Sequence, residues 1–178
     1  MQQPLIRENE AMDIKKPAPQ NNSLHHGFYE LFLPVSDMER AINFYVEKLG
    51  FQIGRQESPS SALLLYNVHG TRSMLGLFRV AAIERRYHLS FRVLEEDVDQ
   101  MVPFLLGRGI TPEHPPRDNI QGPMSEPIVH GWMPAASVFF TDPDGHLLEL
   151  IADLADEPQP DVLYCPLSRW RTISTRSH

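Results

Sequence analysis

Residues 87–93, Tyr-His-Leu-Ser-Phe-Arg-Val, are the stretch of sequence that decides the fold. Apolar and polar side chains alternate along it, and alternation with a period of two predicts a β-strand with one face on the core. The other face carries His88 and Arg92, so we expect it to line a wet or chemically active space.

A related strand occurs 58 positions earlier, at residues 28–35, Phe-Tyr-Glu-Leu-Phe-Leu-Pro-Val. Tyr29 aligns with Tyr87, and Glu30 aligns with His88. An internal repeat weighs more in the assignment of a fold than the propensity of any single segment. The repeat therefore predicts two equivalent strands, each with an acid–base or metal-binding side chain at the same point.

Each copy of the strand opens a β-α-β-β-β unit. In the first unit, the capping-box pair Ser36 and Glu39 predicts a helix that begins at Ser36 and ends at Gly50. In the second unit, Pro103 should kink or shorten the helix expected over Glu96–Arg108. The other strands are expected at residues 51–57, 62–68, 73–80, 136–140 and 146–152, and a long loop rich in Pro and Gly at 111–134. Two βαβββ units contain eight main strands, of which these ranges place seven. We therefore expect an α+β fold, in which paired βαβββ modules form a curved mixed sheet around a central cup.

The chain is expected to divide into three parts. Residues 1–23 are polar and lack periodicity, which predicts a flexible N-terminal arm. Residues 24–152 should form the domain, with modules at about 24–82 and 83–152. Residues 153–178 should form a C-terminal tail, part of which docks because Trp170 is too large an apolar side chain to leave loose.

The composition limits the partners and the location of the protein. A net charge of −7 and a pI near 5.6 argue against nucleic acid or an anionic membrane, because both require basic patches. Cys165 is the only cysteine, which excludes an internal disulfide and suits a reducing cytosol. The N-terminus has no signal-peptide pattern, and no apolar run is long enough to cross a bilayer. We expect a soluble cytoplasmic protein.

Strand parity directs three potential metal ligands into the cup. Glu30 and His88 occupy equivalent points of the repeat, and Glu149 faces the cup from an otherwise aliphatic strand. A charge among aliphatic side chains requires a partner, and two carboxylates with one imidazole suit a divalent Mn, Fe, Co, Ni or Zn ion. Gly76 aligns with Glu149, so the cup should hold open space for water or substrate beside three ligands.

Each candidate also has a purely structural interpretation. Glu30 could be an edge acid that faces water, and His88 could be a hydrogen-bonded core histidine. Arg92 could contact an anionic substrate or only pair with an acid. In the long loop, two histidines could be acid–base groups or exposed side chains, and three large apolar residues could form a lid. These loop residues are His114, His130, Met124, Trp132 and Met133.

Three motifs carry a resemblance to a known family. They lie at residues 33–51, from Leu-Pro-Val-Ser-Asp through Phe-Tyr to Leu-Gly-Phe, at 88–93, and at 142–150, Asp-Pro-Asp-Gly-His-Leu-Leu-Glu-Leu. Over about residues 28–152 the chain resembles the vicinal oxygen chelate superfamily, which includes glyoxalase I, bleomycin-resistance proteins, extradiol dioxygenases and fosfomycin-resistance enzymes. The resemblance implies paired βαβββ modules with metal ligands at Glu30, His88 and Glu149.

The resemblance also implies an activity. We expect a metal-dependent enzyme that acts on a small oxygenated substrate with glyoxalase-like lyase or isomerase chemistry. The metal would chelate neighbouring substrate oxygens, and Glu149 or Glu30 would move a proton. The residues expected to contact the substrate are Phe32, Arg92, His130 and Trp132.

Two other functions remain open at this point. One is an extradiol-type Fe(II) dioxygenase, for which His130 would be the acid–base residue. The other is a metal-free small-molecule binding protein of the bleomycin-resistance type. Members of the family usually pair, so a homodimer is expected, with the tail around Trp170 as a candidate clasp.

Overall fold

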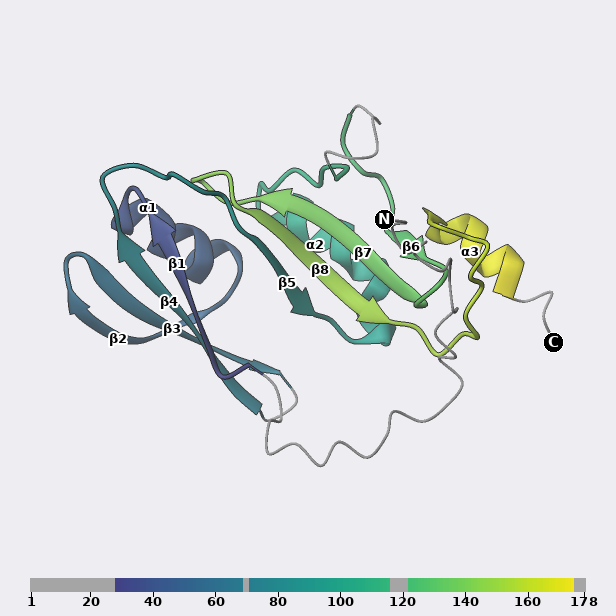
Figure 1. The fold of residues 1–178 in the computed structure, drawn as a ribbon, viewed down its shortest axis with the longest axis horizontal. Helices are drawn as coiled ribbons and strands as arrows, with labels where there is room; N and C mark the ends of the chain where they lie inside the picture. The colour runs from purple at the N-terminus through teal and green to yellow at the C-terminus, as the bar shows by residue number, and fades with distance from the viewer. Residues whose placement is uncertain (1–27, 69–70, 116–121, 175–178) are drawn as a thin grey trace, which may run out of the picture.

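Two mixed β-sheets, each with helical turns on one face, make up the computed structural model (Figure 1). It describes residues 28–68, 71–115 and 122–174. Module one consists of β1 Glu30–Val35, α1 Met38–Ile42, the π-helical η1 Asn43–Lys48, β2 Gln52–Ser58, β3 Ser61–Val68 and β4 Thr71–Arg79. Module two consists of β5 His88–Arg92, the 3₁₀-helical η2 Glu95–Gln100, α2 Met101–Gly107, β6 Ile128–His130, β7 Ala135–Thr141 and β8 Leu147–Asp153. The chain continues into β9 Cys165–Pro166 and α3 Leu167–Ser174.

The two sheets have the same internal order. Module one is ordered β1-β4-β3-β2 and module two is ordered β5-β8-β7-β6, with β9 added at its outer edge. The first strand of each module pairs in parallel with the last, so that Glu30 lies beside Met74 and His88 lies beside Leu147. Glu30 and His88 are therefore equivalent positions of one repeated frame. The α+β class and the duplicated module are confirmed.

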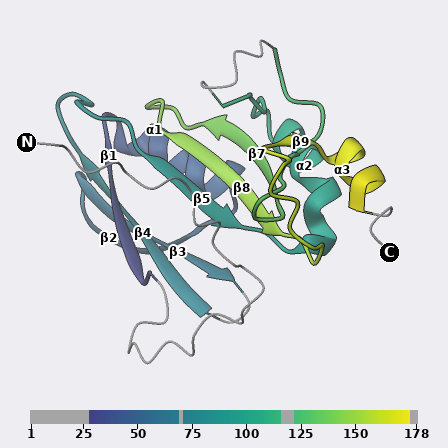
Figure 2. The same cartoon turned by 45° about the vertical axis from the view of Figure 1, so that its right-hand side comes forward.

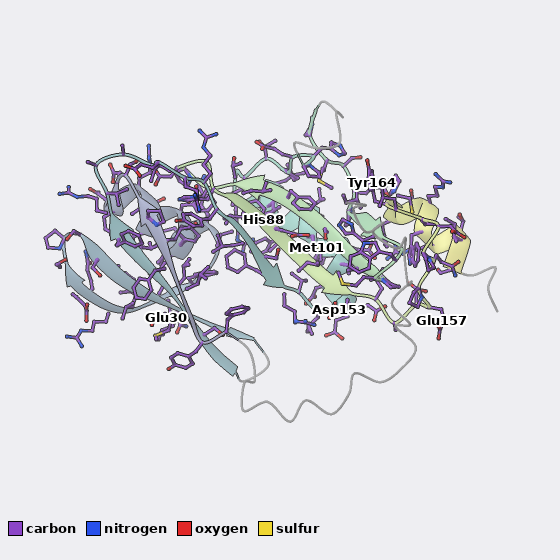
Figure 3. All side chains as sticks on the ribbon, viewed as in Figure 1. Glu30, His88, Met101, Asp153, Glu157 and Tyr164 are labelled. Atoms are coloured by element: carbon purple, nitrogen blue, oxygen red, sulfur yellow. The ribbon has the colours of Figure 1, made fainter. Side chains whose placement is uncertain are left out.

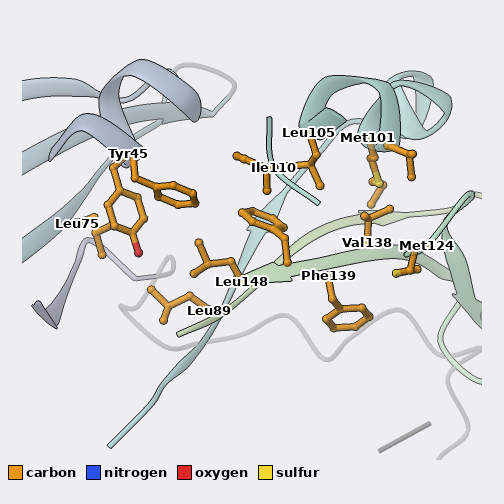
Figure 4. Packing of buried hydrophobic residues seen from close by; sticks show 14 of the residues in the cluster. Tyr45, Leu75, Leu89, Met101, Leu105, Ile110, Met124, Val138, Phe139 and Leu148 are labelled. Carbon is orange, nitrogen blue, oxygen red and sulfur yellow. The ribbon is translucent and has the colours of Figure 1, made fainter. Parts of the chain in front are cut away.

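Alternation along each strand separates two faces. On the helix face of β1, Leu33 and Val35 are fully buried, whereas Glu30 and Phe32 on the opposite face are exposed. The same alternation buries Leu89 in β5. We call the side away from the helices the open face of each sheet. The open faces carry the predicted site residues, and the helix faces supply most of the core, whereas Phe139 points to the opposite side of β7 from Val138 (Figure 4).

The first helix begins at Met38, two residues later than expected. Asp37 is the N-cap, because its side chain accepts a hydrogen bond of 3.0 Å from the backbone N–H of Arg40. The hydroxyl of Ser36 donates instead to Asp144 of module two. The prediction that Ser36 caps the helix is therefore wrong, because that hydroxyl is engaged in a contact between modules that the local sequence does not encode.

The second helix changes form along its length. It runs as a 3₁₀ helix to Gln100 and as an α-helix from Met101. Pro103 lies in the first α-helical turn, two residues after the helix changes type at Met101. The helical segment runs from Glu95 to Gly107, close to its expected bounds, so Pro103 does not shorten it. Val98, Val102 and Leu105 are buried as predicted.

Nine strands occur in the described residues, where eight were expected. The short strand β6 lies inside the segment expected as a loop, and β9 comes from the C-terminal tail and pairs with it. Figure 2 shows β9 and α3 beside this edge of the second sheet. Trp170 of α3 is fully buried, and its indole N–H donates to Asp156 at 2.8 Å. The tail thus docks, as expected, on its own chain.

A polar turn joins the two modules. The carboxylate of Asp142, between β7 and β8, accepts a hydrogen bond of 2.9 Å from the Tyr45 hydroxyl of module one. Asp144 in the same turn accepts from Arg40 at 2.8 Å. His146 is fully buried, with Nε2 2.8 Å from the carbonyl oxygen of Pro34. These bonds fix the modules against each other at one end of β1. No helix in the described ranges is long and apolar enough to cross a membrane.

Candidate functional site

The centre of the candidate site is a pair of side chains from the parallel strands β5 and β8. Ser90 lies beside Glu149 in the register of these strands, and His88 lies two residues earlier on the same face. The imidazole Nε2 of His88 is 3.0 Å from the Oε2 atom of Glu149. The hydroxyl of Ser90 donates to the same oxygen at 2.5 Å. Strand geometry alone therefore brings together an imidazole, a carboxylate and a hydroxyl.

Burial makes the carboxylate of Glu149 unusual. The residue is 5% exposed, and its neighbours along β8 are aliphatic. Transfer of a carboxylate from water into such surroundings is unfavourable unless charge and hydrogen bonds compensate it. The side chain of His88 remains 48% exposed, so the pair has one buried and one accessible partner. This arrangement suits a group that binds or reacts with a small molecule arriving from solvent.

A pocket of about 490 Å³ opens onto this pair. The ring of His88 lies 6.0 Å from the ring of Phe139, which covers the floor from β7. The walls are Pro115, His130, Trp132, Met133, Leu147 and Ile151. The pocket is therefore mainly apolar, with its polar groups gathered at His88, His130 and Glu149.

Arg92 does not line this pocket. Its guanidinium pairs with the carboxylate of Asp153, and both side chains are largely exposed. Of the two interpretations of Arg92, the structure supports the pairing with an acid. Among the described residues, those that line the pocket include neither Lys nor Arg, so this part of the lining does not favour an anionic ligand.

Two of the predicted site residues, Glu30 and Phe32, lie on the other sheet. Figure 3 shows Glu30 on module one, away from His88. Neither residue lines the pocket beside Glu149. Within residues 28–68, 71–115 and 122–174, no three His, Cys, Asp or Glu side chains lie close enough together to hold a metal ion. Within a single chain, His88 and Glu149 therefore lie together, and Glu30 lies apart from them.

The space expected beside Gly76 is filled. A Cβ atom on this glycine would lie 2.5 Å from two ring carbons of Phe32, so the ring lies directly over the glycine backbone. The expectation that Gly76 leaves room for water or substrate is therefore wrong within one chain. Strand pairing explains the contact, because Phe32 and Gly76 are register partners in β1 and β4.

The long loop contributes only part of the expected lid. Trp132 and Met133 line the pocket and are partly exposed, whereas Met124 is buried in the core. His130 reaches the pocket from the end of β6. His114 does not line it, and its Nδ1 atom is buried without a hydrogen-bond partner among the described residues.

Sequence reasoning did not single out two members of the site, Ser90 as a partner of Glu149 and Phe139 as the floor. The sequence nevertheless contains a signal that could have identified both residues. Ser90 shares its face with His88, and Phe139 stands opposite Glu149 in the antiparallel pair of β7 and β8. Parity could have identified them once the order of the strands was assumed.

The duplicated βαβββ frame is that of a recognised class of proteins. Residues 24–150 match the Glyoxalase/Bleomycin resistance protein/Dioxygenase superfamily, and the chain belongs to this superfamily.

Solved structures share the fold. An integron cassette protein from the mobile metagenome of the Halifax Harbour sewage outfall is 29% identical with a TM-score of 0.57, covering 72% of this chain and 99% of its own. A lactoylglutathione lyase from Agrobacterium tumefaciens is 18% identical with a TM-score of 0.54, covering 73% and 96%. The oxidase ChaP-H2 is 21% identical with a TM-score of 0.55, covering 72% and 94%. Since these structures bear the names of different activities, the fold alone does not determine the reaction.

Proposed function

We propose that this protein is a metal-dependent, glyoxalase-like enzyme that acts on a small, neutral, oxygenated substrate. The observation that carries the proposal is the buried carboxylate of Glu149, 3.0 Å from the imidazole of His88, at the base of an apolar pocket. Perturbed or paired ionisable groups in a cleft are typical of reactive sites. The single cysteine, Cys165, suits a cytoplasmic enzyme.

His88 and Glu149 could supply two of the ligands of a divalent metal ion. The imidazole of His88 and the carboxylate of Glu149 are ligand types that Mn, Fe, Co, Ni and Zn accept, and they already lie together on rigid strands. An ion held there would polarise neighbouring oxygens of a bound substrate. A third ligand is needed for a catalytic site of this kind, and Glu30 of the same chain is not beside the pair.

We therefore propose a homodimer in which Glu30 of a second copy completes the site. The open face of module one supports this arrangement. Phe32 is 54% exposed and Phe78 is 37% exposed on that face, which is an apolar surface that water does not favour. In the repeat Glu30 occupies the position of His88, so a two-fold axis that pairs module one of one copy with module two of the other would set the carboxylate opposite the pair. Trp170 itself is buried in its own chain.

The residues of the chain have separate roles in the proposed reaction. Glu149 accepts the proton, and the Ser90 hydroxyl fixes the orientation of its carboxylate. Both hydrogen bonds end on Oε2, and among the described residues no donor reaches Oε1, which leaves that oxygen for the substrate. Trp132 and Phe139 exclude water from the reacting atoms. The carboxylate of Glu149 and the absence of Lys and Arg from the described part of the lining favour a neutral substrate.

Thermal melting with added metal tests the proposal. Mn²⁺, Co²⁺, Ni²⁺ or Zn²⁺ at a hundredfold excess over its Kd should raise the Tm by about 5–10 °C, since the ion binds only the folded state. His88→Ala and Glu149→Gln should abolish the rise. Glu96→Gln, the same kind of change on the exposed surface of η2, is the matched control and should keep it. No rise with any metal in the wild-type protein would remove the enzyme proposal.

Mixing two variants tests the shared site. Glu30→Gln and His88→Ala should each lose metal binding alone. When the two are unfolded and refolded together, about a quarter of the sites should bind metal again, because half of the dimers are mixed and one of their two sites is intact. Recovery would be absent if each site belonged to one chain, and light scattering that showed only monomer would contradict the dimer directly.

The aromatic lining favours a second candidate function, a metal-free protein that sequesters a flat apolar ligand. Trp132 and Phe139 provide ring surfaces suited to stacking. Elemental analysis of protein purified without added metal separates the two functions, since the binding protein should contain none. A dioxygenase with His130 as its acid–base group would consume oxygen when catechol and Fe(II) are supplied, whereas the proposed lyase or isomerase would not.

A further inference from the structure

The turn between β6 and β7, residues 131–134, forms one wall of the pocket. Trp132 and Met133 lie in this turn, and His130 lies at the end of β6 directly before it. A small displacement of the turn would move all three side chains relative to the His88–Glu149 pair. The position of this turn therefore sets the width of the pocket.

The segment between β8 and β9, residues 154–164, holds this turn, and we call it the C-terminal strap. The backbone N–H of Gly131 donates to the carbonyl of Val162 at 3.1 Å, and the N–H of Gln159 donates to the carbonyl of Gly131 at 2.7 Å. The N–H of Leu154 donates to the carbonyl of Pro134 at 2.8 Å. Both ends of the turn are thus bonded to the strap through backbone groups.

Glycine is required at position 131 for this contact. A Cβ atom there would lie 2.5 Å from the carbonyl oxygen of Val162 and 2.9 Å from that of Gln159. Both are backbone atoms, which cannot move aside as the end of a flexible side chain can. The glycine therefore serves close approach of two backbone segments.

The strap is itself anchored at both ends to the core of module two. Near its start, Asp156 accepts the hydrogen bond of 2.8 Å from the fully buried Trp170. Beyond its end, Cys165 pairs with Val129 in the β9–β6 ladder. Because the strap is anchored at both ends, it can hold the turn that it contacts in one position.

We propose that the C-terminal strap is a positioning element of the pocket, which holds Trp132 and His130 through Gly131 and so determines the size of ligand that the pocket admits. The inference rests on the proposed function in one respect, namely that this pocket is the binding site. The strap lies outside residues 24–150, which match the superfamily, whereas the turn that it holds lies within them.

The position of the wall can be measured without any ligand. The chain has two tryptophans, Trp132 and Trp170, so an ¹H–¹⁵N spectrum has two indole resonances, and Trp132→Phe assigns them. Gly131→Ala should shift the Trp132 resonance and accelerate amide exchange at residues 131–133. Gly107→Ala, where a Cβ would meet no atom within 4 Å, is the matched control and should change neither. An unmoved Trp132 resonance in folded Gly131→Ala would overturn the inference.

Ligand selection provides the second readout. Catechol and 2,3-dihydroxynaphthalene are neutral probes with the same oxygen pair and different widths, and their Kd values follow from quenching of tryptophan fluorescence. Gly131→Ala should change the ratio of the two Kd values by about fivefold or more, because the wall has moved. Loss of affinity by the same factor for both probes would overturn the inference, since a general loss of stability predicts that result.

A second variant covers the case in which Gly131→Ala does not fold. Asp156→Asn weakens the anchor of the strap at a residue that does not line the pocket, and it should shift both the Trp132 resonance and the ratio in the same direction. If the wild-type protein binds neither probe and no metal, the proposed function fails, and the Trp132 resonance still decides whether the strap positions the wall.

Discussion

Modules one and two use the same strand frame for opposite purposes. At equivalent register positions, module one has Phe32 over Gly76, and module two has Ser90 bonded to Glu149. The first pair covers bare backbone with an aromatic ring, and the second pair stabilises a buried carboxylate. Duplication of the sheet therefore fixes which positions lie side by side. The residue types at one register pair decide whether those positions form an apolar contact or a polar site.

The modules also differ in how they are joined, and the largest effect should come from that joint. Asp142 belongs to module two, is buried, and accepts hydrogen bonds from the Tyr45 hydroxyl and from the backbone N–H of His146 at 2.8 Å. Asp142→Ala should lower the free energy of unfolding by about 3 kcal/mol, because it leaves several buried donors without acceptors. Urea denaturation measures the change. Asp37→Ala, which removes only the cap of α1, should lower it by about 1 kcal/mol. An equal decrease in the free energy of unfolding for the two variants would show that the hydrogen bonds of Asp142 stabilise the fold no more than one helix cap does.

The aromatic contact of module one can be broken directly. Gly76→Ala sets a methyl group where the ring of Phe32 lies, and the resulting overpacking should lower the free energy of unfolding by about 2 kcal/mol. Phe32→Ala in the same chain should recover about 1 kcal/mol of that loss, as a double-mutant cycle by urea denaturation would measure. Strictly additive losses would mean that the ring moves away from Gly76 without consequence.

The pH dependence of the joint gives a further test. Burial, the nearby charge of Asp142 and the hydrogen bond to it raise the pKa of Tyr45 above its ordinary value. The folded state therefore favours the neutral phenol, so this contribution to stability is present below about pH 10, the pKa in the unfolded chain, and is lost as the pH rises above it. Between pH 9 and pH 11 the wild-type protein should lose about 1.4 kcal/mol more than Tyr45→Phe. Parallel pH profiles for the two proteins would contradict the assignment.

The smallest effect is expected where the tail of module two meets its surface. A hydrogen bond from the Arg171 guanidinium lowers the pKa of Asp99, so the pair contributes stability above about pH 4 that is lost as the pH falls through the folded-state pKa. Both side chains are mostly exposed, so Asp99→Asn should lower the free energy of unfolding at pH 7 by less than about 0.5 kcal/mol. The difference from the wild-type protein should shrink as the pH falls below about 4. A loss as large as that of Asp142→Ala would place α3 among the main supports of the fold.

Much of the fold follows from periodicity in the sequence. The alternation in residues 28–35 and 87–93 predicts both parallel edge strands and the equivalence of Glu30 and His88, which the register confirms. The strand β6 was not predicted, because it has only three residues and follows a segment rich in Pro and Gly. Its partner β9 is also too short to show a period, and such pairings depend on tertiary contacts rather than on local pattern.

The candidate site is predictable in part for the same reason. Parity directs His88 and Glu149 to one face, and their contact follows because β5 and β8 are neighbours. The alternation along the strands does not show whether the two sheets of one chain lie close enough for Glu30 to contact His88 and Glu149. It also cannot show that the ring of Phe32 lies over Gly76, since the choice of rotamer depends on what is packed beside it.

The parallel pairing of β1 with β4 and of β5 with β8 has a consequence for the order of folding during synthesis. All pairing partners of β1 to β4 lie within module one, so its sheet can close before module two leaves the ribosome. Each parallel pair joins the first and last strand of its module, which raises contact order and slows closure. The Tyr45 hydroxyl gains its acceptor only when Asp142 of module two is in place. Until then, a nascent chain carries one finished sheet with an exposed apolar face.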